Sequence, residues 1–232
     1  MSTNHNYCVV LPAYNEQAGI GCTVSGIRRH CKNVVVVDDG SSDATASEAE
    51  KSGAFVLRHE TNKGKGAALN TGFKHALDRN YEFVITMDSD GQHDPDDLAG
   101  FIEEYDRSGT PVLIGNRMGQ NDGMPFVRKM TNLFMSSLLS RKMKQAVPDT
   151  QSGYRLYRKD VLPIAMCESS GFAAESEVLL NIAAQGIRIG SVPIKVIYGN
   201  EQSKIRTGRD TVRFFSMLWR YGNLEDHKRQ GN

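Results

Sequence analysis

The sequence predicts an α/β fold with a mostly parallel, doubly wound sheet, and three observations lead to this prediction. Short apolar runs recur along the first half of the chain, as expected for strands that are buried on both faces. Stretches with a helical pattern lie between these runs, which gives the β-α-β-α order of such a sheet. A cluster of polar residues follows each run, at the carboxyl end of the strand where sheets of this class bind ligands.

The predicted elements of the first half follow one another in a regular order. The strands are Cys8 to Leu11, Val34 to Val37, Phe83 to Met87 and Val112 to Ile114. The helices are Gln17 to His30, Asp43 to Ser52, Gly66 to Arg79 and Pro95 to Arg107. Together they predict a nucleotide-type fold in which four strand ends converge on one crevice.

The second half has a different composition and predicts a second layer. A basic, Met-rich helical stretch runs from Gln120 to Lys144, and a polar turn follows at Asp149 to Arg155. The remaining expected elements are a helix at Ala174 to Gln185, a strand at Ile187 to Val192, an extended stretch through Tyr198 and a helix at Thr211 to Tyr221.

Length and composition limit the possible functions. The 232 residues, 39% of them hydrophobic, fit a single domain over 1–232 with a first half at 7–118, a second half at 119–210 and a C-terminal amphipathic helix and tail at 211–232. The 28 lysines and arginines nearly balance the 27 aspartates and glutamates, so no nucleic-acid partner is expected.

The cysteines and the hydropathy pattern indicate the cellular location of the protein. Metal-ligand spacing and a disulfide framework are both missing, so we expect reduced thiols in the core at Cys8, Cys22, Cys31 and Cys167. The first seven residues are polar, unlike a signal peptide, and no apolar run is long enough to cross a membrane. We expect a cytoplasmic protein, at most attached to the cytoplasmic face of a membrane.

Asp88-Ser89-Asp90 is the most specific chemical signal in the sequence. Two carboxylates two residues apart at a strand end can share a hard divalent cation that bridges a diphosphate. Gln92 is the expected third ligand, and His93 is near enough to reach the same ion or its phosphates. The alternative is an acidic cap before the helix that follows. Because no Walker loop and no G-x-G-x-x-G occurs, ATPase and dinucleotide functions lose their main support.

Two other strand ends and one loop add binding candidates. Asp39 can hydrogen-bond a nucleobase or a ribose, while Asp43 can cap the following helix. The loop Asn62 to Gly66, which contains Lys65, can offer amides and ammonium groups to an anion, or it is a glycine-rich loop with solvated lysines. Arg117 is placed to contact a diphosphate or a lipid phosphate, with a surface salt bridge as the alternative.

Six motifs occur in order along the chain: V-L-P-A-Y-N-E (Val10 to Glu16), V-V-D-D-G-S-S-D (Val36 to Asp43), N-K-G-K-G-A-A-L-N-T-G (Asn62 to Gly72), M-D-S-D-G-Q-H-D-P (Met87 to Pro95), D-T-Q-S-G-Y-R (Asp149 to Arg155) and F-A-A-E-S-E (Phe172 to Glu177). Together they resemble family-2 glycosyltransferases, most closely the dolichyl-phosphate mannosyltransferase and polyprenyl-phosphate glycosyltransferase branch. The resemblance implies a GT-A fold, an inverting transfer, and a nucleotide-diphosphate-sugar donor held through Mg²⁺ or Mn²⁺.

The resemblance also implies roles for individual positions. The donor-binding set is Pro12, Tyr14, Glu16, Val37, Asp39, Lys65 and Ser89. The metal ligands are Asp88, Asp90 and Gln92. The residues implied in phosphate binding and catalysis are Asp90, Arg117, Asp149, Arg155, Glu177, Lys204 and Arg206. On this basis 7–118 is the donor-binding half and 119–210 is the acceptor half.

The acceptor implied by the resemblance is a polyprenyl phosphate that takes a hexose from a GDP- or UDP-sugar. Its attacking oxygen is already anionic, whereas a sugar hydroxyl would need a carboxylate base. Asp149, Glu175 and Glu177 are the candidates for that base, and ion pairing to Arg155 or Lys204 is the alternative role of the last two.

The sequence lacks the C-terminal transmembrane helices found in much of this branch. The helix at Thr211 to Tyr221 could instead bind an anionic membrane surface through an apolar side with basic flanks, or it could be a core helix. A membrane protein is a further possible partner. A soluble glycan or protein acceptor stays open, as does a sugar nucleotidyltransferase, although Pro12 to Glu16 stands where that enzyme would carry a glycine-rich signature.

Overall fold

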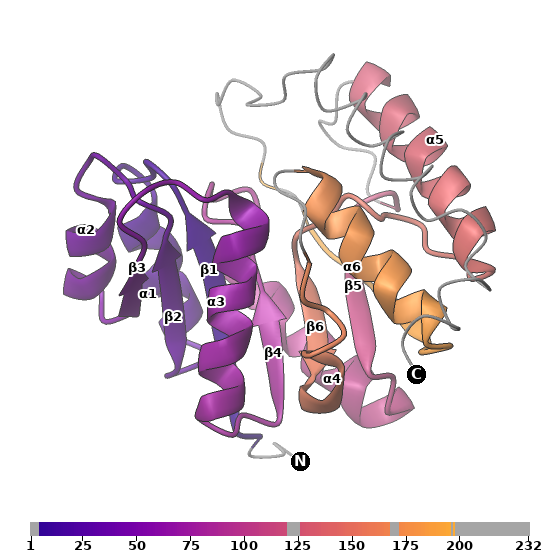
Figure 1. Cartoon of the computed structure of the whole chain (residues 1–232), viewed down its shortest axis with the longest axis horizontal. Helices are drawn as coiled ribbons and strands as arrows, with labels where there is room; N and C mark the ends of the chain where they lie inside the picture. The colour runs from indigo at the N-terminus through magenta and orange to yellow at the C-terminus, as the bar shows by residue number, and fades with distance from the viewer. Residues whose placement is uncertain (1–4, 120–125, 168–171, 196, 198–232) are drawn as a thin grey trace.

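A computed structural model describes residues 5–119, 126–167, 172–195 and 197. Within these residues seven strands form one sheet in the order β3-β2-β1-β4-β6-β5-β7 (Figure 1). The strands are β1 Tyr7–Ala13, β2 Val34–Asp38, β3 Phe55–Arg58, β4 Phe83–Thr86, β5 Val112–Asn116, β6 Arg155–Arg158 and β7 Ile189–Pro193.

The sheet is parallel except for β6. This strand runs antiparallel to both of its neighbours, with Leu156 opposite Ile85 of β4 and opposite Leu113 of β5. The other strand pairs are parallel, and β1 lies between β2 and β4. The mostly parallel α/β sheet expected from the sequence is confirmed.

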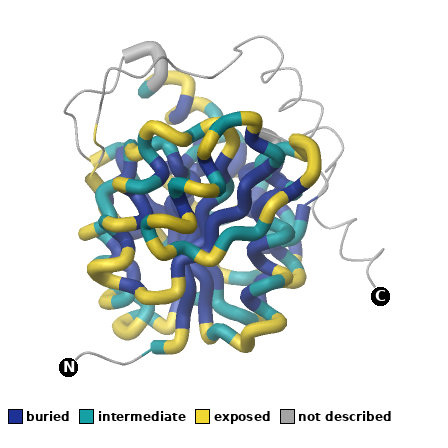
Figure 2. The backbone as a smooth tube through the Cα atoms, turned by 90° about the vertical axis from the view of Figure 1, so that its left-hand side faces the viewer, coloured by how far each residue is buried: buried dark blue, intermediate teal, exposed yellow. Residues whose placement is uncertain are grey.

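Helices cover both faces of the sheet. They are α1 Ile20–Arg28, α2 Thr45–Lys51, α3 Lys65–Asp78, α4 Leu98–Ser108, α5 Phe126–Met143 and α6 Phe172–Ala184, with short 3₁₀ helices at Pro95–Asp97 and Lys159–Val161. In Figure 1, α3 and α6 lie in front of the sheet, and α1 and α4 lie behind it. Figure 2 shows buried segments running through the centre of the molecule and exposed segments on its outer turns.

The apolar runs arise because alternate residues of each strand pack against different helical layers. In β1, Cys8 and Val10 join the cluster that contains Phe73 of α3, whereas Val9 packs in the cluster that contains Ile27 of α1. All of these side chains are fully buried. Each buried aliphatic or aromatic side chain of this kind contributes about 1.5–3 kcal/mol, so both faces of β1 must be apolar.

A close approach between α3 and β1 positions Lys65 at the site. A Cβ on Gly72 would overlap the Cγ1 atom of Val10, so only glycine lets the helix lie this close to the strand. The first residue of this helix is Lys65, whose side chain reaches the carboxyl end of the sheet.

Two strands were not expected from the sequence. β3 is an edge strand whose residues are exposed or half-buried, so it lacks the apolar signature of the inner strands. β6 runs over Arg155–Arg158 and begins at the buried Arg155, the residue that ends the polar turn expected from the sequence. A charged residue buried between two strands is a tertiary feature that hydropathy does not indicate.

Other expectations have mixed outcomes. Cys8, Cys31 and Cys167 are buried free thiols as expected, but the prediction is wrong for Cys22, which is exposed on α1. Across the ranges that the structure describes, every helix is too short or too polar to cross a membrane. The predicted helix at Thr211 to Tyr221 lies outside the described residues.

Candidate functional site

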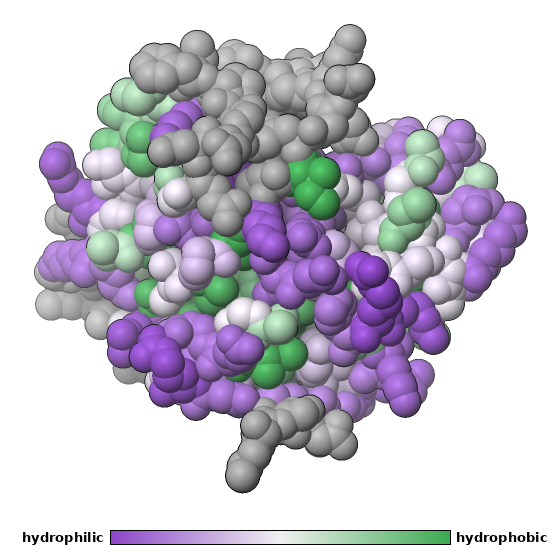
Figure 3. All heavy atoms as spheres, turned by 180° about the vertical axis from the view of Figure 1, so that it is seen from behind, coloured by the Kyte–Doolittle hydropathy of each residue, from purple (hydrophilic) through white to green (hydrophobic). Residues whose placement is uncertain are grey.

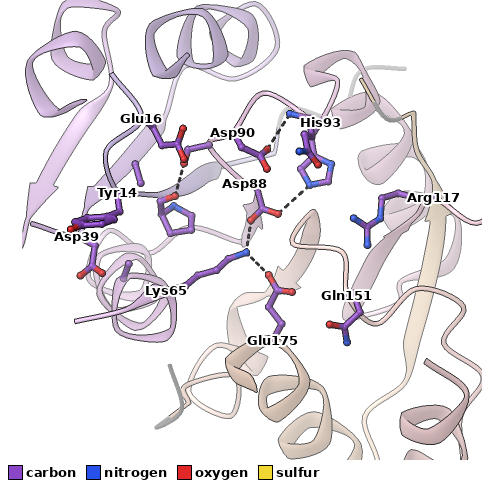
Figure 4. A pocket seen from close by; sticks show the side chains of 15 residues that line it. Tyr14, Glu16, Asp39, Lys65, Asp88, Asp90, His93, Arg117, Gln151 and Glu175 are labelled. Atoms are coloured by element: carbon purple, nitrogen blue, oxygen red, sulfur yellow. Dashed lines mark hydrogen bonds and ion pairs between the residues drawn. The ribbon is translucent and has the colours of Figure 1, made fainter. Parts of the chain in front are cut away.

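A cavity of about 290 Å³ opens at the carboxyl ends of β1, β2, β4 and β5 (Figure 4). It is lined by Pro12, Ala13, Tyr14, Glu16, Asp39, Lys65, Ala68, Asp88, Ser89, Asp90, Gln92, His93, Arg117, Gln151 and Glu175. Most of the predicted donor-binding residues and all three predicted metal ligands are therefore in one place. The crevice expected from four polar strand ends is present.

The first two strand ends are tied together by Asn15. This residue has a φ of 54°, a left-handed conformation that asparagine tolerates better than most residues. Its backbone N–H donates to the hydroxyl of Ser41 at 2.9 Å, and its side-chain oxygen accepts from the backbone N–H of Ser42 at 3.0 Å. Asp43 meanwhile accepts from the backbone N–H of Thr45, the first residue of α2, at 3.0 Å.

Asp39 is held by three hydrogen-bond donors. Its Oδ1 accepts from His59 Nδ1 at 2.7 Å and from the backbone N–H of Lys63 at 2.9 Å. Its Oδ2 accepts from the backbone N–H of Gly64 at 2.7 Å. Two amides of the loop at Asn62 to Gly66 are thus used internally, and Asp39, which lines the cavity, keeps one acceptor position on Oδ2.

Asp88, Ser89 and Asp90 follow β4 along the chain. Ser89 donates its hydroxyl to the carbonyl of Pro12 at 2.9 Å, and Asp90 Oδ1 accepts from the backbone N–H of Gln92 at 3.1 Å. Behind Asp88, a Cβ on Gly153 would lie 2.6 Å from Oδ2 and 2.7 Å from Cγ. The carboxylate of Asp88 therefore fills the space that any larger residue at 153 would occupy.

The predicted metal ligands suit a hard divalent cation whose coordination is completed by a bound ligand. The two carboxylates and the Gln92 amide belong to side chains that line the cavity, and each has an oxygen atom that can bind a cation. The described part of the chain contains no group of three or more His, Cys, Asp or Glu residues that could hold a metal ion by itself. Mg²⁺ is commonly bound by one or two carboxylates together with phosphate oxygens and water, which matches this incomplete set.

Lys65 bridges two acidic residues in the cavity. Its Nζ contacts Asp88 Oδ1 at 2.5 Å and also contacts Glu175 Oε1 (Figure 4). Burial alone would lower the pKa of Lys65, but the charges of Asp88 and Glu175 outweigh it and raise the pKa. Burial alone would raise the pKa of Asp88, but Lys65 and His93 lower it. Lys65 and Asp88 therefore both favour their ionised forms.

Arg117 forms a paired, two-point contact with Asp149. The distances are 2.6 Å from Nε to Oδ2 and 2.8 Å from Nη2 to Oδ1. Burial alone would lower the pKa of Arg117, but the hydrogen bonds and charge of Asp149 raise it. The salt bridge that the sequence left open as the alternative role of Arg117 is present, but it is buried and not on the surface. Among the described residues no acceptor bonds the third nitrogen, Nη1.

Several predicted residues do not line the cavity. Val37 packs in the core, and Asp149 and Glu177 are buried. Arg155 lies beneath the floor, where it donates to the carbonyls of Ser152, Thr150 and Glu175. Lys204 and Arg206 lie outside the described residues.

Sequence reasoning underrated three residues that shape the site. Glu175 lines the cavity and was considered only as a possible base or ion-pair partner; its ion pair with Arg155 is present at 3.8 Å. Gln151 lines the cavity, and its motif was the available signal. His59 was missed because a lone histidine after a weak edge strand has no sequence signature.

Three comparisons bear on this geometry. The sequence profile of glycosyl transferase family 2 matches residues 8–163. A UDP-N-acetylglucosamine–dolichyl-phosphate N-acetylglucosaminyltransferase of Methanococcus voltae is 31% identical, over 91% of this chain and 93% of that protein. An undecaprenyl-phosphate mannosyltransferase of Micrococcus luteus is 32% identical, over 81% of this chain and 82% of that protein.

A solved structure has the same fold. Glucosyl-3-phosphoglycerate synthase from Mycobacterium tuberculosis, in complex with Mn²⁺, uridine diphosphate and glucosyl-3-phosphoglycerate, superposes with a TM-score of 0.75 at 20% identity. The match covers 94% of this chain and 80% of that one. The fold is therefore GT-A-like, and the profile match over two thirds of the sequence shows that the chain belongs to family 2 of the glycosyltransferases.

Proposed function

We propose that this glycosyltransferase moves a hexose from a UDP- or GDP-sugar to a polyprenyl phosphate, with Mg²⁺ or Mn²⁺ and with inversion at the transferred carbon. The observation that carries the proposal is the cavity, which gathers Asp39, the Asp88–Asp90 pair and Arg117 around one space. Its volume of about 290 Å³ is near the lower end of the range for small-molecule sites. We propose a single domain with a donor half at 7–118 and an acceptor half at 119–210.

The cavity residues have distinct roles toward the donor. Asp39 binds the base, Tyr14 and Glu16 border the nucleoside, and Ser89 lies against the ribose or the sugar. Asp88, Asp90 and Gln92 would hold the cation, which would neutralise charge on the departing diphosphate. Arg117 would turn its remaining nitrogen toward a phosphate, because Asp149 fixes the other side of the guanidinium.

The number of free hydrogen-bond acceptor positions on Asp39 favours uracil as the base. A carboxylate has about four acceptor positions, and three of them are occupied by His59, Lys63 and Gly64. Oδ1 already accepts two bonds and Oδ2 accepts one. One position is enough for the single N3–H of uracil. Guanine presents two adjacent donors, which need an acceptor on each oxygen.

A phosphate acceptor agrees with the state of the buried carboxylates. Asp149 is committed to Arg117, and Glu175 is paired with Lys65 and Arg155. Neither is in a position to remove a proton from a sugar hydroxyl, whereas a phosphate oxygen needs no base. The two named relatives act on dolichyl phosphate and undecaprenyl phosphate, according to their names, which supports the same class of acceptor.

A lipid acceptor calls for contact with a membrane, and α5 offers a suitable surface. Met130, Leu133 and Phe134 are 49%, 39% and 58% exposed on this helix, and the exposed Arg141 lies near its end. Figure 3 shows apolar atoms at the upper left of the molecule, on the side where α5 lies. We propose that this face rests on the cytoplasmic leaflet, where apolar side chains with basic neighbours bind anionic lipids.

The test is calorimetric titration with UDP and GDP, each with and without Mn²⁺, followed by transfer assays. We expect metal-dependent nucleotide binding and transfer of the sugar to a short-chain polyprenyl phosphate. Asp90→Ala should abolish metal-dependent binding, and Asp78→Ala, at an exposed site on α3, should not change it.

Three results would count against the proposal. Equal binding by the Asp90 variant with metal would remove the site assignment. Turnover with a soluble acceptor and none with lipid would instead favour the class of reaction named for the mycobacterial structure. Release of pyrophosphate from a nucleoside triphosphate would indicate a nucleotidyltransferase.

A further inference from the structure

The ammonium group of Lys65 contacts the carboxylate of Asp88, which is one of the proposed ligands of the metal ion. Its Nζ lies 2.5 Å from Oδ1 of Asp88 and also contacts Glu175 (Figure 4). The side chain of Glu175 is 3% exposed, whereas that of Asp88 is 25% exposed and borders the cavity. Lys65 is therefore anchored on its buried side and neutralises a metal ligand on its open side.

Asp88 has little freedom to turn away from this contact. One of its oxygens meets Lys65, and the other lies 3.5 Å from Nε2 of His93. Gly153 closes the space behind the carboxylate, since even a Cβ there would lie 2.6 Å from Oδ2. A divalent ion that approaches Asp88 from the cavity must therefore share the carboxylate with the ammonium or displace it.

Sharing is electrostatically unfavourable unless another anion is present. A divalent ion and an ammonium group on one carboxylate repel each other across a few ångströms. The negative charges of Asp88, Asp90 and Glu175 are already partly balanced by Lys65. A nucleoside diphosphate brings further negative charge, which can accept the ammonium while it completes the coordination of the ion.

We infer that Lys65 is a resident counter-ion of the metal site, which makes binding of the divalent ion depend on the nucleotide. Without nucleotide the ammonium stays on Asp88 and the ion binds weakly. With nucleotide the ammonium moves to a diphosphate oxygen and leaves Asp88 to the ion. This inference rests on the proposed function for the identity of the ligand, but its central claim concerns the nucleotide-free protein.

The test is the affinity for Mn²⁺ alone, measured from the electron paramagnetic resonance signal of free Mn²⁺. Lys65→Met should bind Mn²⁺ roughly tenfold or more tightly than the unaltered protein when no nucleotide is present. Lys65→Arg, which keeps the charge, should resemble the unaltered protein. Lys63→Met is the matched control, because Lys63 is exposed in the same loop and contacts Asp39 only through its backbone.

Reciprocal coupling gives a second readout. Uridine diphosphate should raise Mn²⁺ affinity strongly in the unaltered protein and much less in Lys65→Met, because the competing charge is already gone. Lys65→Gln removes the charge but keeps a polar side chain with N–H donors, and it serves if the methionine variant does not fold. Unchanged Mn²⁺ affinity in a folded Lys65→Gln protein, or an equal gain in Lys63→Met, would overturn the inference. Failure of the unaltered protein to bind any nucleotide would instead remove the proposed function.

Discussion

The guanidinium of Arg117 and the carboxylate of Asp149 lie edge to edge, joined by bonds of 2.6 Å and 2.8 Å. The two side chains are 7% and 0% exposed, although 32 residues separate them in the sequence. The backbone N–H of Arg117 also donates to Asp149 at 3.2 Å. The pair therefore fixes the loop after β5 to the segment before β6 at the border of the cavity.

Removal of one partner should cost far more than removal of both. Asp149→Ala leaves a buried, unpaired guanidinium, and we expect it to lower the free energy of unfolding by about 3–5 kcal/mol. Arg117→Met with Asp149→Leu should recover much of this loss while the rate of glycosyl transfer stays low. Urea unfolding measures the first effect. Asp160→Ala breaks an exposed pair with Arg158 and should cost less than about 1 kcal/mol.

Gly153 should be essential to the position of Asp88. A methyl group there would push the carboxylate into the cavity, so Gly153→Ala should weaken metal-dependent nucleotide binding about tenfold or more. Calorimetric titration with Mn²⁺ and UDP checks this. Gly19→Ala is the control, since nothing lies within 4 Å of its added Cβ. Normal binding by the Gly153 variant would show that Asp88 does not need its observed position.

The single remaining acceptor on Asp39 predicts a preference for uracil. UDP should bind more tightly than GDP, and methylation of N3 in UDP should abolish the preference because it removes the only donor. Loss of the 2′-hydroxyl should have a smaller effect. Tighter binding of GDP, or indifference to N3 methylation, would show that Asp39 does not read the base.

His5 should stabilise the fold in a pH-dependent way. Burial alone would lower its pKa, but Glu82 and Asp106 raise the pKa above 6.5. A raised pKa means that the folded state binds the proton more tightly, so the contribution is complete below pH 6.5 and is lost as the pH rises. The stability difference between the unaltered protein and His5→Gln should be below about 1 kcal/mol and should shrink above neutral pH.

His75 supplies a control with the opposite sign. Burial and the charge of Arg79 lower its pKa, so the stability of the unaltered protein relative to His75→Gln should rise as the pH increases through 6.5. Unfolding curves of both variants between acidic and mildly alkaline pH measure the two slopes. Parallel slopes would contradict the assignment of the His5 ion pairs.

The exposed apolar side chains of α5 should govern binding to lipid. Leu133→Glu combined with Phe134→Glu should lower co-sedimentation with anionic vesicles without a change in the affinity for UDP, because neither residue lines the cavity. Phe55→Glu is matched in exposure at 48% but lies on the edge strand β3, at the far side of the sheet. Equal loss in both proteins would point to general hydrophobicity.

The inner strands could be predicted because they are apolar on both faces, as Val34 to Val37 illustrate. β6 could not, because the residue that begins it is Arg155, whose buried guanidinium donates to carbonyl groups of the preceding turn and of α6. The edge strand β3 could not be predicted for a different reason. Its residues are exposed or half-buried, so they need no regular apolar pattern.

The site shows the same division. Asp88 and Asp90 were identifiable because carboxylate spacing at a strand end has direct chemical meaning. The link between Lys65, Asp88 and Glu175 was not, because Glu175 is 110 residues from Lys65 and only the packing of α6 beside α3 brings them together. Pairing of buried charges across the chain is set by tertiary structure and leaves no local pattern.

The antiparallel strand β6 makes the two halves of the sequence parts of one sheet. It comes from the second half of the sequence, yet it lies between β4 and β5, which carry the acidic pair and Arg117 at their ends. A chain cut after residue 118 would lose a central strand, so the first half is not a module that could be exchanged as a block. A new acceptor specificity would therefore have to arise in the loops at the rim of the cavity, while the whole sheet stays unchanged.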